Sequence, residues 1–261
     1  MTAPFAPTRL PAWLQDLAGA WIFYSVLPAW PMIPPRFERI ARFAPWIGAV
    51  LGGVQALVWL ELEGWVPLLS QVALVQALGL VLSGGLHADG AMDTADGLAA
   101  GDRRLEAMAD SRVGASGVQA LAVLLLVRSA ALAALGPLAP LPLLWTAIWG
   151  RVAPLLAMGR FAYLRPEGGS AAFHHQHWRG LAQELRPALL LVGGVLLVSW
   201  LRGWSLVGAA GLVPALVVPH WLGRRLGGHS GDSYGACVEW SEALGLLGCA
   251  ALAVFMPRLT G

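Results

Sequence analysis

Three aspartates at helical spacing are the residues in this sequence best suited to chemistry: Asp89, Asp93 and Asp96. On a helix that turns about 100° per residue, their carboxylates fall within an arc of about 60°, whereas His87 points to the far side. Carboxylates crowded on one face repel each other, and a divalent cation removes that repulsion. Because every ligand is an oxygen, we predict a site for Mg²⁺, or for Mn²⁺, rather than for zinc. The alternative is a solvated helix face that binds no ligand.

These aspartates lie beside long apolar segments, in a chain of which only 12% of the residues are charged. Five of the seven aspartates of the chain fall between residues 89 and 110. Charged side chains are costly next to a membrane core, so a cluster of them there indicates a functional site.

A second polar segment, residues 227–236, contains Ser230, Asp232 and Ser233 among four glycines. Loops of this composition let backbone N–H groups approach a phosphate, although turns between helices look similar. Glu239 follows inside an apolar helix, where a carboxylate requires a polar partner. We therefore treat this segment as a second candidate part of the site.

A third segment, residues 173–178, carries His174, His175 and His177. The segment is either a metal-binding histidine patch or an interfacial loop that contacts anionic ligands or lipid headgroups. Because no Cys, Asp or Glu stands at ligand spacing, the second interpretation is favoured over a zinc site.

Arg128 and Arg151 lie within predicted membrane spans. Each either extends toward the membrane surface or pairs with an inward carboxylate such as Glu239. Cys237 and Cys249 are separated by about 18 Å along one predicted helix, so a disulfide between them is excluded.

The composition identifies the class of protein that must position these groups. The chain has 261 residues, of which 57% are hydrophobic, and its charged fraction of 12% is about half that of a soluble domain. We predict an all-α, polytopic integral membrane protein. The net charge of +2 is too small to indicate a nucleic-acid partner. All seventeen basic residues are arginine, which excludes a catalytic Schiff-base lysine, and no secretory signal is expected at the N-terminus.

Hydropathy predicts about seven transmembrane helices, at 40–62, 66–86, 115–135, 143–161, 187–201, 204–222 and 236–256. Residues 13–30 are apolar but interrupted by Asp16 and Pro28, and they are predicted to form an additional N-terminal interfacial or re-entrant helix. Without an internal repeat or a linker, the chain is expected to form a single membrane-embedded domain over residues 1–261.

The distribution of arginines orients this topology. Arg202 and Arg258 fall on one side of the predicted membrane, and twelve arginines fall on the other. These twelve are Arg36, Arg39, Arg42, Arg103, Arg104, Arg112, Arg160, Arg165, Arg179, Arg186, Arg224 and Arg225. By the positive-inside rule the richer side is cytoplasmic. We therefore expect a multi-pass protein of a bacterial inner membrane, with all three polar segments on the cytoplasmic face.

The motifs at 84–97, 105–114 and 231–236 resemble those of the cobalamin synthase family. They read Gly-Gly-Leu-His-x-Asp-Gly-x-x-Asp-Thr-Ala-Asp-Gly, Leu-Glu-x-Met-x-Asp-Ser-Arg-x-Gly and Gly-Asp-x-x-Gly-Ala, the last followed by Glu239. The run Ala-Pro-Trp-Ile-Gly at 44–48 is also similar, so the resemblance extends over nearly the whole chain.

Two departures from the family pattern occur in the first motif. Ala88 replaces a larger or acidic residue, and Ala91 with Met92 replaces the more usual Leu-Ala pair. Neither departure removes a carboxylate, so the function implied by the resemblance stands.

The resemblance implies an enzyme that transfers the cobinamide-phosphate group from adenosylcobinamide-GDP to α-ribazole or α-ribazole 5′-phosphate. GMP is released and adenosylcobalamin or its 5′-phosphate is formed. The attacking group is a ribose hydroxyl. Such a phosphoryl transfer needs neutralisation of charge, in-line geometry and removal of one proton.

This reaction implies a role for each candidate residue. The ligands expected to hold one or two Mg²⁺ ions on the pyrophosphate are Asp89, Asp93, Asp96 and Asp110. The residues expected to bind substrate are Arg103, Ser111, Arg112 and Ser233. The catalytic candidates are Asp232, His87 and Glu239, and the proton acceptor is Asp232, His87 or one of the cluster aspartates. Expected partners are the two small-molecule substrates and membrane lipid, with a homo-oligomer as a further option.

Two other functions were weighed. Residues 93–100 match the opening of the CDP-alcohol phosphatidyltransferase signature, but Gly101 stands where that family carries arginine. A cation transporter with the aspartates as its ion site is the non-enzymatic alternative. Transporter sites lie near midspan, whereas these aspartates lie at a span end beside glycines and arginines, as in an active site at headgroup level.

Overall fold

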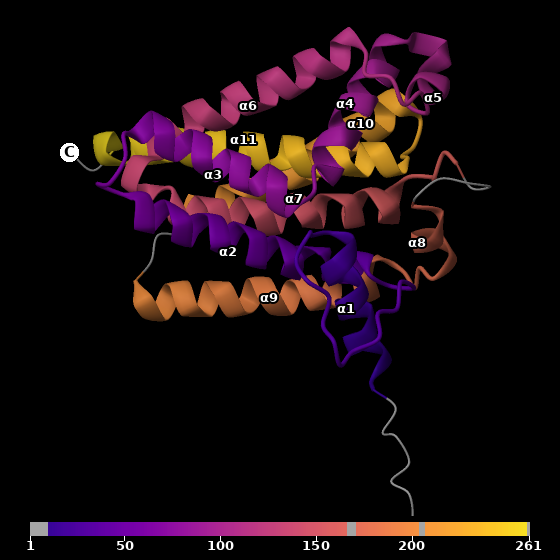
Figure 1. Cartoon of the computed structure of the whole chain (residues 1–261), viewed down its shortest axis with the longest axis horizontal. Coiled ribbons are helices and arrows are strands. Elements are labelled where there is room, and N and C mark those ends of the chain that lie inside the picture. Colours follow the sequence, from indigo (N-terminus) through magenta and orange to yellow (C-terminus); the bar gives the residue numbers. More distant parts are fainter. Residues whose placement is uncertain (1–9, 166–170, 204–206, 260–261) are drawn as a thin grey trace, which may run out of the picture.

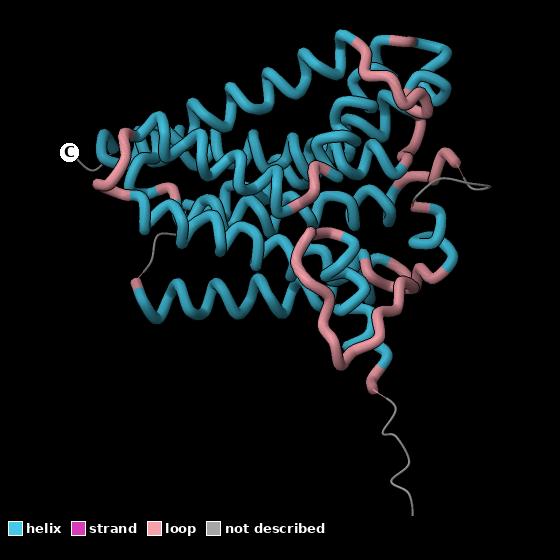
Figure 2. The backbone as a smooth tube through the Cα atoms, viewed as in Figure 1, coloured by secondary structure: helices cyan, strands magenta, loops and turns pink. Residues whose placement is uncertain are grey.

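A computed structural model describes residues 10–165, 171–203 and 207–259, and the regular elements of these residues are all helices (Figures 1 and 2). The α-helices are α1 (Ala12–Phe23), α2 (Ala44–Leu62), α3 (Leu68–Leu82), α4 (Leu86–Ala99), α5 (Arg104–Ala107), α6 (Ala115–Leu135), α7 (Pro140–Arg160), α8 (Ala172–Gln176), α9 (Leu181–Arg202), α10 (Leu212–Leu226) and α11 (Gly231–Leu259). The 3₁₀ helices are η1 (Ala41–Phe43), η2 (Gly101–Arg103), η3 (Gly136–Leu138) and η4 (Val207–Gly211).

The predicted class of an all-helical, polytopic membrane protein is confirmed. In the described part of the chain, five helices are long and apolar enough to cross a membrane: α2, α6, α7, α9 and α11. The count rises to six if α3 and α4 form one broken span. The predicted count of about seven transmembrane helices is therefore higher than the five or six that are long and apolar enough to cross a membrane in the described residues.

The first difference from the prediction is a sharp bend between α3 and α4. The two helices meet at an angle of 91°. Gly84 and Gly85 form the bend with φ values of +63° and +71°, which favour glycine because it has no Cβ. The predicted span at 66–86 therefore stops at this bend, and α4 carries the aspartates out of the direction of α3.

The second difference is the predicted span at 204–222, whose first three residues lie outside the described part of the chain. Here η4 and α10 contain only 5 and 15 residues. They still lead from one end of the bundle to the other. Gly208 packs against Trp145 at the start of α7, and Gly228, after α10, lies against Ala162 beyond the end of α7.

The three polar segments of the sequence meet at one end of the bundle. Helices α4, α5 and α8 and the start of α11 lie together on the right of Figure 1, whereas the α2–α3 and α6–α7 connections lie at the opposite end. A short backbone bridge ties the 227–236 segment to the chain that follows α7. The Leu164 N–H donates to the His229 carbonyl at 2.8 Å, and the His229 N–H donates to the Ala162 carbonyl at 2.9 Å.

Helix α1 has 12 residues and is therefore about 18 Å long, too short to cross a bilayer. Its Asp16 is fully buried and accepts hydrogen bonds from Arg36 Nε at 2.7 Å and Arg42 Nη2 at 2.9 Å. These ion pairs hold α1 against the chain that enters α2.

Helix α7 is the centre of the bundle. In the apolar segment of α7 that is long enough to cross a membrane, 83% of the residues are buried. The corresponding value for α9, which lies at the edge of the bundle, is 11%. Helix α2 packs on α7 at Gly48, where a Cβ would lie 2.3 Å from the Ala147 carbonyl oxygen. Cys237 and Cys249 are buried and free, in agreement with the prediction.

Candidate active site

Helices α4 and α11 cross in close contact at two glycines. A Cβ at Gly90 would lie 2.6 Å from the Asp232 carbonyl oxygen, and one at Gly235 would lie 3.0 Å from the His87 carbonyl oxygen. Glycine is required at Gly90 because a side chain has no room there. The crossing places the first turn of α11, with Asp232, against the aspartates of α4.

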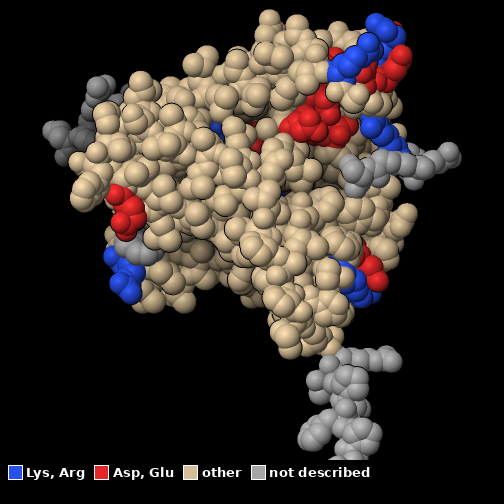
Figure 3. All heavy atoms as spheres, in the orientation of Figure 1, with Lys and Arg blue, Asp and Glu red and all other residues tan. Residues whose placement is uncertain are grey.

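Three carboxylates gather at this crossing, and we call them the carboxylate cluster: Asp89, Asp93 and Asp232. Asp93 is within electrostatic range of the other two and of Arg165. The Asp232 carboxylate lies 3.7 Å from Arg165 Nη1 and accepts a hydrogen bond from Ser230 Oγ at 3.3 Å. Asp89 is exposed, and Figure 3 shows acidic side chains at the surface over α4. The cluster is thus an open acidic site with one arginine at its edge.

Asp96, the third aspartate of the predicted helix face, has a different environment. Its two oxygens accept hydrogen bonds from the Gly114 and Gly117 N–H groups, each at 2.8 Å. These donors belong to the start of α6, whose first N–H groups have no partner within the helix. Asp96 therefore joins α4 to α6 and fixes the orientation of the aspartate face.

The carboxylate cluster fits a metal ion that binds together with a substrate phosphate. Within residues 10–165, 171–203 and 207–259, no three His, Cys, Asp or Glu side chains converge tightly enough to enclose a metal by themselves. Mg²⁺ is commonly held by one or two carboxylates, waters and the phosphates of its substrate. Asp89 and Asp93, one turn apart on α4, supply oxygen ligands of that kind.

The structure gives Asp110 a partner other than a metal. Its carboxylate pairs with the Arg112 guanidinium, 2.6 Å from Nη2, and this contact lowers the pKa of Asp110 to about 2. The Arg112 side chain is 88% exposed, and Ser111 and Arg103 are exposed as well. The metal role of Asp110 stays a prediction, and in this structure the positive charge beside its carboxylate is supplied by Arg112.

Ser233 is predicted to bind substrate, and in this structure its hydroxyl has partners within the protein. It is fully buried, and its hydroxyl accepts a hydrogen bond from the Ser230 N–H at 2.8 Å and lies 3.0 Å from His229 Nδ1. The side chain closes the first turn of α11, as residues at helix starts often do. Ser233 thus stabilises the loop.

Glu239 is part of a buried group of four charges that we call the charge quartet: Arg128, Arg151, Glu239 and Glu242. Arg128 Nη1 lies 2.6 Å from Glu239 Oε2, Arg151 Nη1 lies 2.6 Å from Glu242 Oε1, and Arg128 also contacts Glu242. Pairing of Arg128 with Glu239 was one of the two predicted alternatives and is confirmed. The catalytic role of Glu239 stays a prediction, and in this structure its carboxylate neutralises Arg128 in the protein interior.

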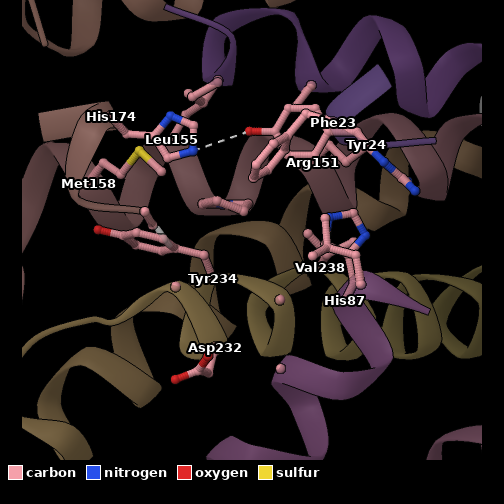
Figure 4. Close-up of a pocket in the computed structure, with 18 of the residues that line it drawn as sticks. Phe23, Tyr24, His87, Arg151, Leu155, Met158, His174, Asp232, Tyr234 and Val238 are labelled. Carbon is pink, nitrogen blue, oxygen red and sulfur yellow. Dashed lines mark hydrogen bonds between the residues drawn. The ribbon is translucent and has the colours of Figure 1, made fainter. Parts of the chain in front are cut away.

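A cavity of about 130 Å³ opens beside the carboxylate cluster. Asp89 and Asp232 line it together with His87, and the rest of its wall is largely apolar and aromatic (Figure 4). His87 is buried, and its ring stacks on Tyr24 with centroids 6.1 Å apart. The sequence predicted His87 on the side of α4 away from the aspartates; His87 is buried and Asp89 is exposed, but both line this cavity.

The histidine segment contributes to the wall of this region. His174 Nε2 lies 3.5 Å from the Tyr24 hydroxyl, and His175 Nε2 lies 2.8 Å from the Tyr234 hydroxyl. Burial lowers the pKa of His174 to about 3 and also lowers the pKa of His175. His177 is exposed. His174 and His175 thus face different partners, the hydroxyls of Tyr24 and Tyr234.

Sequence reasoning did not find four residues of the site: Tyr24, Arg165, Tyr234 and Arg151 as a cavity residue. Tyr24 lies in an apolar stretch where an aromatic residue indicates membrane anchoring, and Tyr234 stands in a loop interpreted for its glycines. Proximity to Asp232 was the signal that would have singled out Tyr234.

Comparison with known proteins identifies similar sequences over almost the full length of the chain. Residues 16–250 match the family described as cobalamin-5-phosphate synthase. An adenosylcobinamide-GDP ribazoletransferase of Prochlorococcus marinus (strain MIT 9313) is 56% identical, with 95% of this chain and 99% of the relative covered. The corresponding protein of strain MIT 9303 is 58% identical, with 94% and 98% covered, and that of Thermosynechococcus vestitus is 44% identical, with 88% and 93% covered. No solved structure matches this chain.

Proposed function

The chain belongs to the cobalamin-5-phosphate synthase family, and from this premise we propose that the carboxylate cluster is the active centre of an adenosylcobinamide-GDP ribazoletransferase. The activity itself, a step in assembling the nucleotide loop of cobalamin, follows from identities of 56% and 58% over nearly full length. One observation supports the location most: the crossing at Gly90 joins Asp232 to the aspartates of α4.

The proposed reaction is a displacement at phosphorus. A ribose hydroxyl of α-ribazole or its 5′-phosphate forms a bond to the phosphorus that carries cobinamide. The bond from this phosphorus to the bridging oxygen breaks, and GMP leaves with the bonding electron pair. The hydroxyl proton goes to Asp232, which lies at the mouth of the cavity and next to Asp89. A positioned carboxylate base of this kind contributes about 10²- to 10⁴-fold to the rate.

Asp89 and Asp93 are proposed to hold Mg²⁺, or Mn²⁺, on the pyrophosphate. When bound, the metal supplies neutralisation of the charge that builds up on the phosphate oxygens and on GMP. Arg165, 3.7 Å from Asp232, is placed to bind a phosphate oxygen. Asp96 acts as a positioning residue, since its hydrogen bonds to α6 fix the direction of α4.

A direct assay tests this proposal. Purified protein with Mg²⁺, adenosylcobinamide-GDP and α-ribazole 5′-phosphate should release one GMP for each product molecule formed. Chelation of the metal with EDTA should stop the release, and added Mg²⁺ should restore it. Absence of GMP release from a folded preparation with both substrates would contradict the function. GMP release that persists in EDTA would contradict the metal assignment alone.

The two other functions weighed above have less support. The matched family covers residues 16–250, which includes the cluster, the histidine segment and the loop before α11. The relatives named above are ribazoletransferases, neither lipid synthases nor transporters. The exposure of Asp89 also fits an active site that meets its substrates at the membrane surface.

We further propose that this end of the bundle faces the cytoplasm of a bacterial inner membrane. Asp102 in η2 and Leu138 in η3 lie at opposite ends of α6 and are both exposed. In a protein without Cys237 and Cys249, a cysteine in place of Leu138 should react with an impermeant maleimide in intact cells. A cysteine in place of Asp102 should react only after the cells are opened. Labelling of the second variant in intact cells would reverse the proposed orientation.

A further inference from the structure

We infer that the cavity beside the carboxylate cluster binds the heteroaromatic base of the acceptor nucleoside, so that its wall selects which base enters the product. This inference rests on the proposed function, because it assigns one of the two substrates to a place. It adds a binding site that neither the family nor the charge pattern assigns.

The size of the cavity suits one flat ring system. Its volume is about 130 Å³. An engineered apolar cavity of about 150 Å³ binds benzene, so a space of this size holds an aromatic ring. A benzimidazole has a second, fused ring, which this cavity accommodates toward its open end near Asp89 and Asp232.

The wall matches the faces of such a base. The wall contains the rings of Phe23, Tyr24 and His174 and the apolar side chains of Leu155, Met158 and Val238, and Figure 4 shows Leu155 and Met158 beside His174. Aromatic side chains prefer stacked or edge-to-face contact with another ring. Methionine adapts its shape to irregular ligands. An uncharged, largely apolar base is therefore favoured over a polar purine.

Three buried polar atoms of the cavity wall have no hydrogen-bond partner among the residues that the structure describes: His87 Nδ1, His174 Nδ1 and Arg151 Nε. Each of these side chains is at most 6% exposed. An unsatisfied buried polar group costs free energy, which a ligand recovers by supplying the missing partner. In α-ribazole one ring nitrogen carries the sugar and the other is free to accept a hydrogen bond. Arg151 Nε–H, or an imidazole N–H, supplies the donor.

The position of the cavity gives the substrate a direction. Its apolar part lies among α2, α7 and α8, and its acidic end is formed by Asp89 and Asp232. A base in the apolar part therefore leaves its ribose at the acidic end, where Asp232 takes the proton of the hydroxyl. The guanine of the donor has more hydrogen-bonding atoms on its edge than the three unpaired atoms of the wall can bind. Guanine is therefore a poorer fit to this cavity than the base of the acceptor.

A cavity-filling variant tests the inference. Ala44 lines the cavity and is 7% exposed, whereas Val50 on the same helix is 36% exposed. We expect Ala44→Phe to weaken binding of α-ribazole by at least about tenfold, the lower end of mismatches in apolar pockets. Val50→Phe is the matched control and should bind as the parent does. Binding is measured by calorimetry on full-length protein in nanodiscs, in EDTA and without donor.

A second variant covers the case in which Ala44→Phe does not fold. Met158→Ala enlarges the cavity and should shift the preference among α-ribazole analogues toward larger bases, measured as a ratio of kcat/KM values. Two outcomes would overturn the inference: unchanged α-ribazole binding in folded Ala44→Phe, or weakened binding of adenosylcobinamide-GDP in its place. A failure of the proposed function is distinguishable, since the parent protein would then release no GMP with either acceptor.

Discussion

Replacing Asp93 with asparagine is expected to lower the rate of GMP release by about 10³-fold or more, which abolishes turnover in practice. The variant should still fold and insert into the membrane. The amide keeps the shape of the side chain but removes the charge that attracts Mg²⁺, and a catalytic metal contributes several kcal/mol to stabilisation of the transition state. Asp93 is suited to this role because it lies one turn from Asp89 and within range of Asp232. The measurement is GMP release at saturating substrates over a series of Mg²⁺ concentrations.

The control for this experiment is Asp102→Asn. Asp102 is an exposed aspartate in η2, a few residues after the cluster, and its replacement should leave the rate unchanged. Both variants should unfold at the temperature of the parent protein. Activity close to normal in Asp93→Asn at saturating Mg²⁺ would remove the carboxylates of α4 from the metal site.

Replacing Asp232 with alanine is expected to lower the rate at saturating donor by about 10²-fold or more, with little change in Mg²⁺ dependence. The reason is that Asp232 accepts a proton in the proposed reaction, whereas Asp89 and Asp93 hold the metal. GMP release is measured against Mg²⁺ and Mn²⁺ concentration, and the stability of the variant is measured in parallel.

Other roles of Asp232 give different results. If its carboxylate binds the metal, raised Mg²⁺ or added Mn²⁺ should partly restore activity. If it only stabilises the first turn of α11, where it accepts a hydrogen bond from Ser230, the loss should be about 1 kcal/mol of stability with intact specific activity. Parent-level activity in folded Asp232→Ala would exclude this loop from the mechanism.

Local patterns predicted the parts of the site that depend on helical spacing. The period of a helix placed Asp89 and Asp93 on one face, and the two carboxylates lie within electrostatic range of each other. His87 was predicted on the opposite face, but it lines the same cavity as Asp89. The asymmetry of arginines brought Asp232 to the same end of the bundle, although hydropathy alone does not give contacts between helices. The close crossing at Gly90 depends on the packing of two helices, which no single segment determines.

The sequence could not predict which partner each polar side chain has in the folded protein. Asp110, Ser233 and Glu239 have the right chemistry for a site, but each is satisfied by a protein group: Arg112, the Ser230 N–H and Arg128. A sequence shows that a buried polar group needs a partner, without naming that partner. The span count differed for a similar reason, because the bend at Gly84 and the short α10 are decided by tertiary packing.

The charge quartet has a consequence for biogenesis. Arg128 and Arg151 lie on α6 and α7, whereas Glu239 and Glu242 lie on α11, which the ribosome makes after those two helices. Arginine within a bilayer is costly until it is paired, so the two earlier helices enter the membrane before their counter-charges exist. Insertion of α11 neutralises them, and the same helix delivers Asp232 to α4. Completion of the active site is thereby coupled to insertion of α11, and a chain that stops before α11 has neither a neutral interior nor a finished catalytic centre.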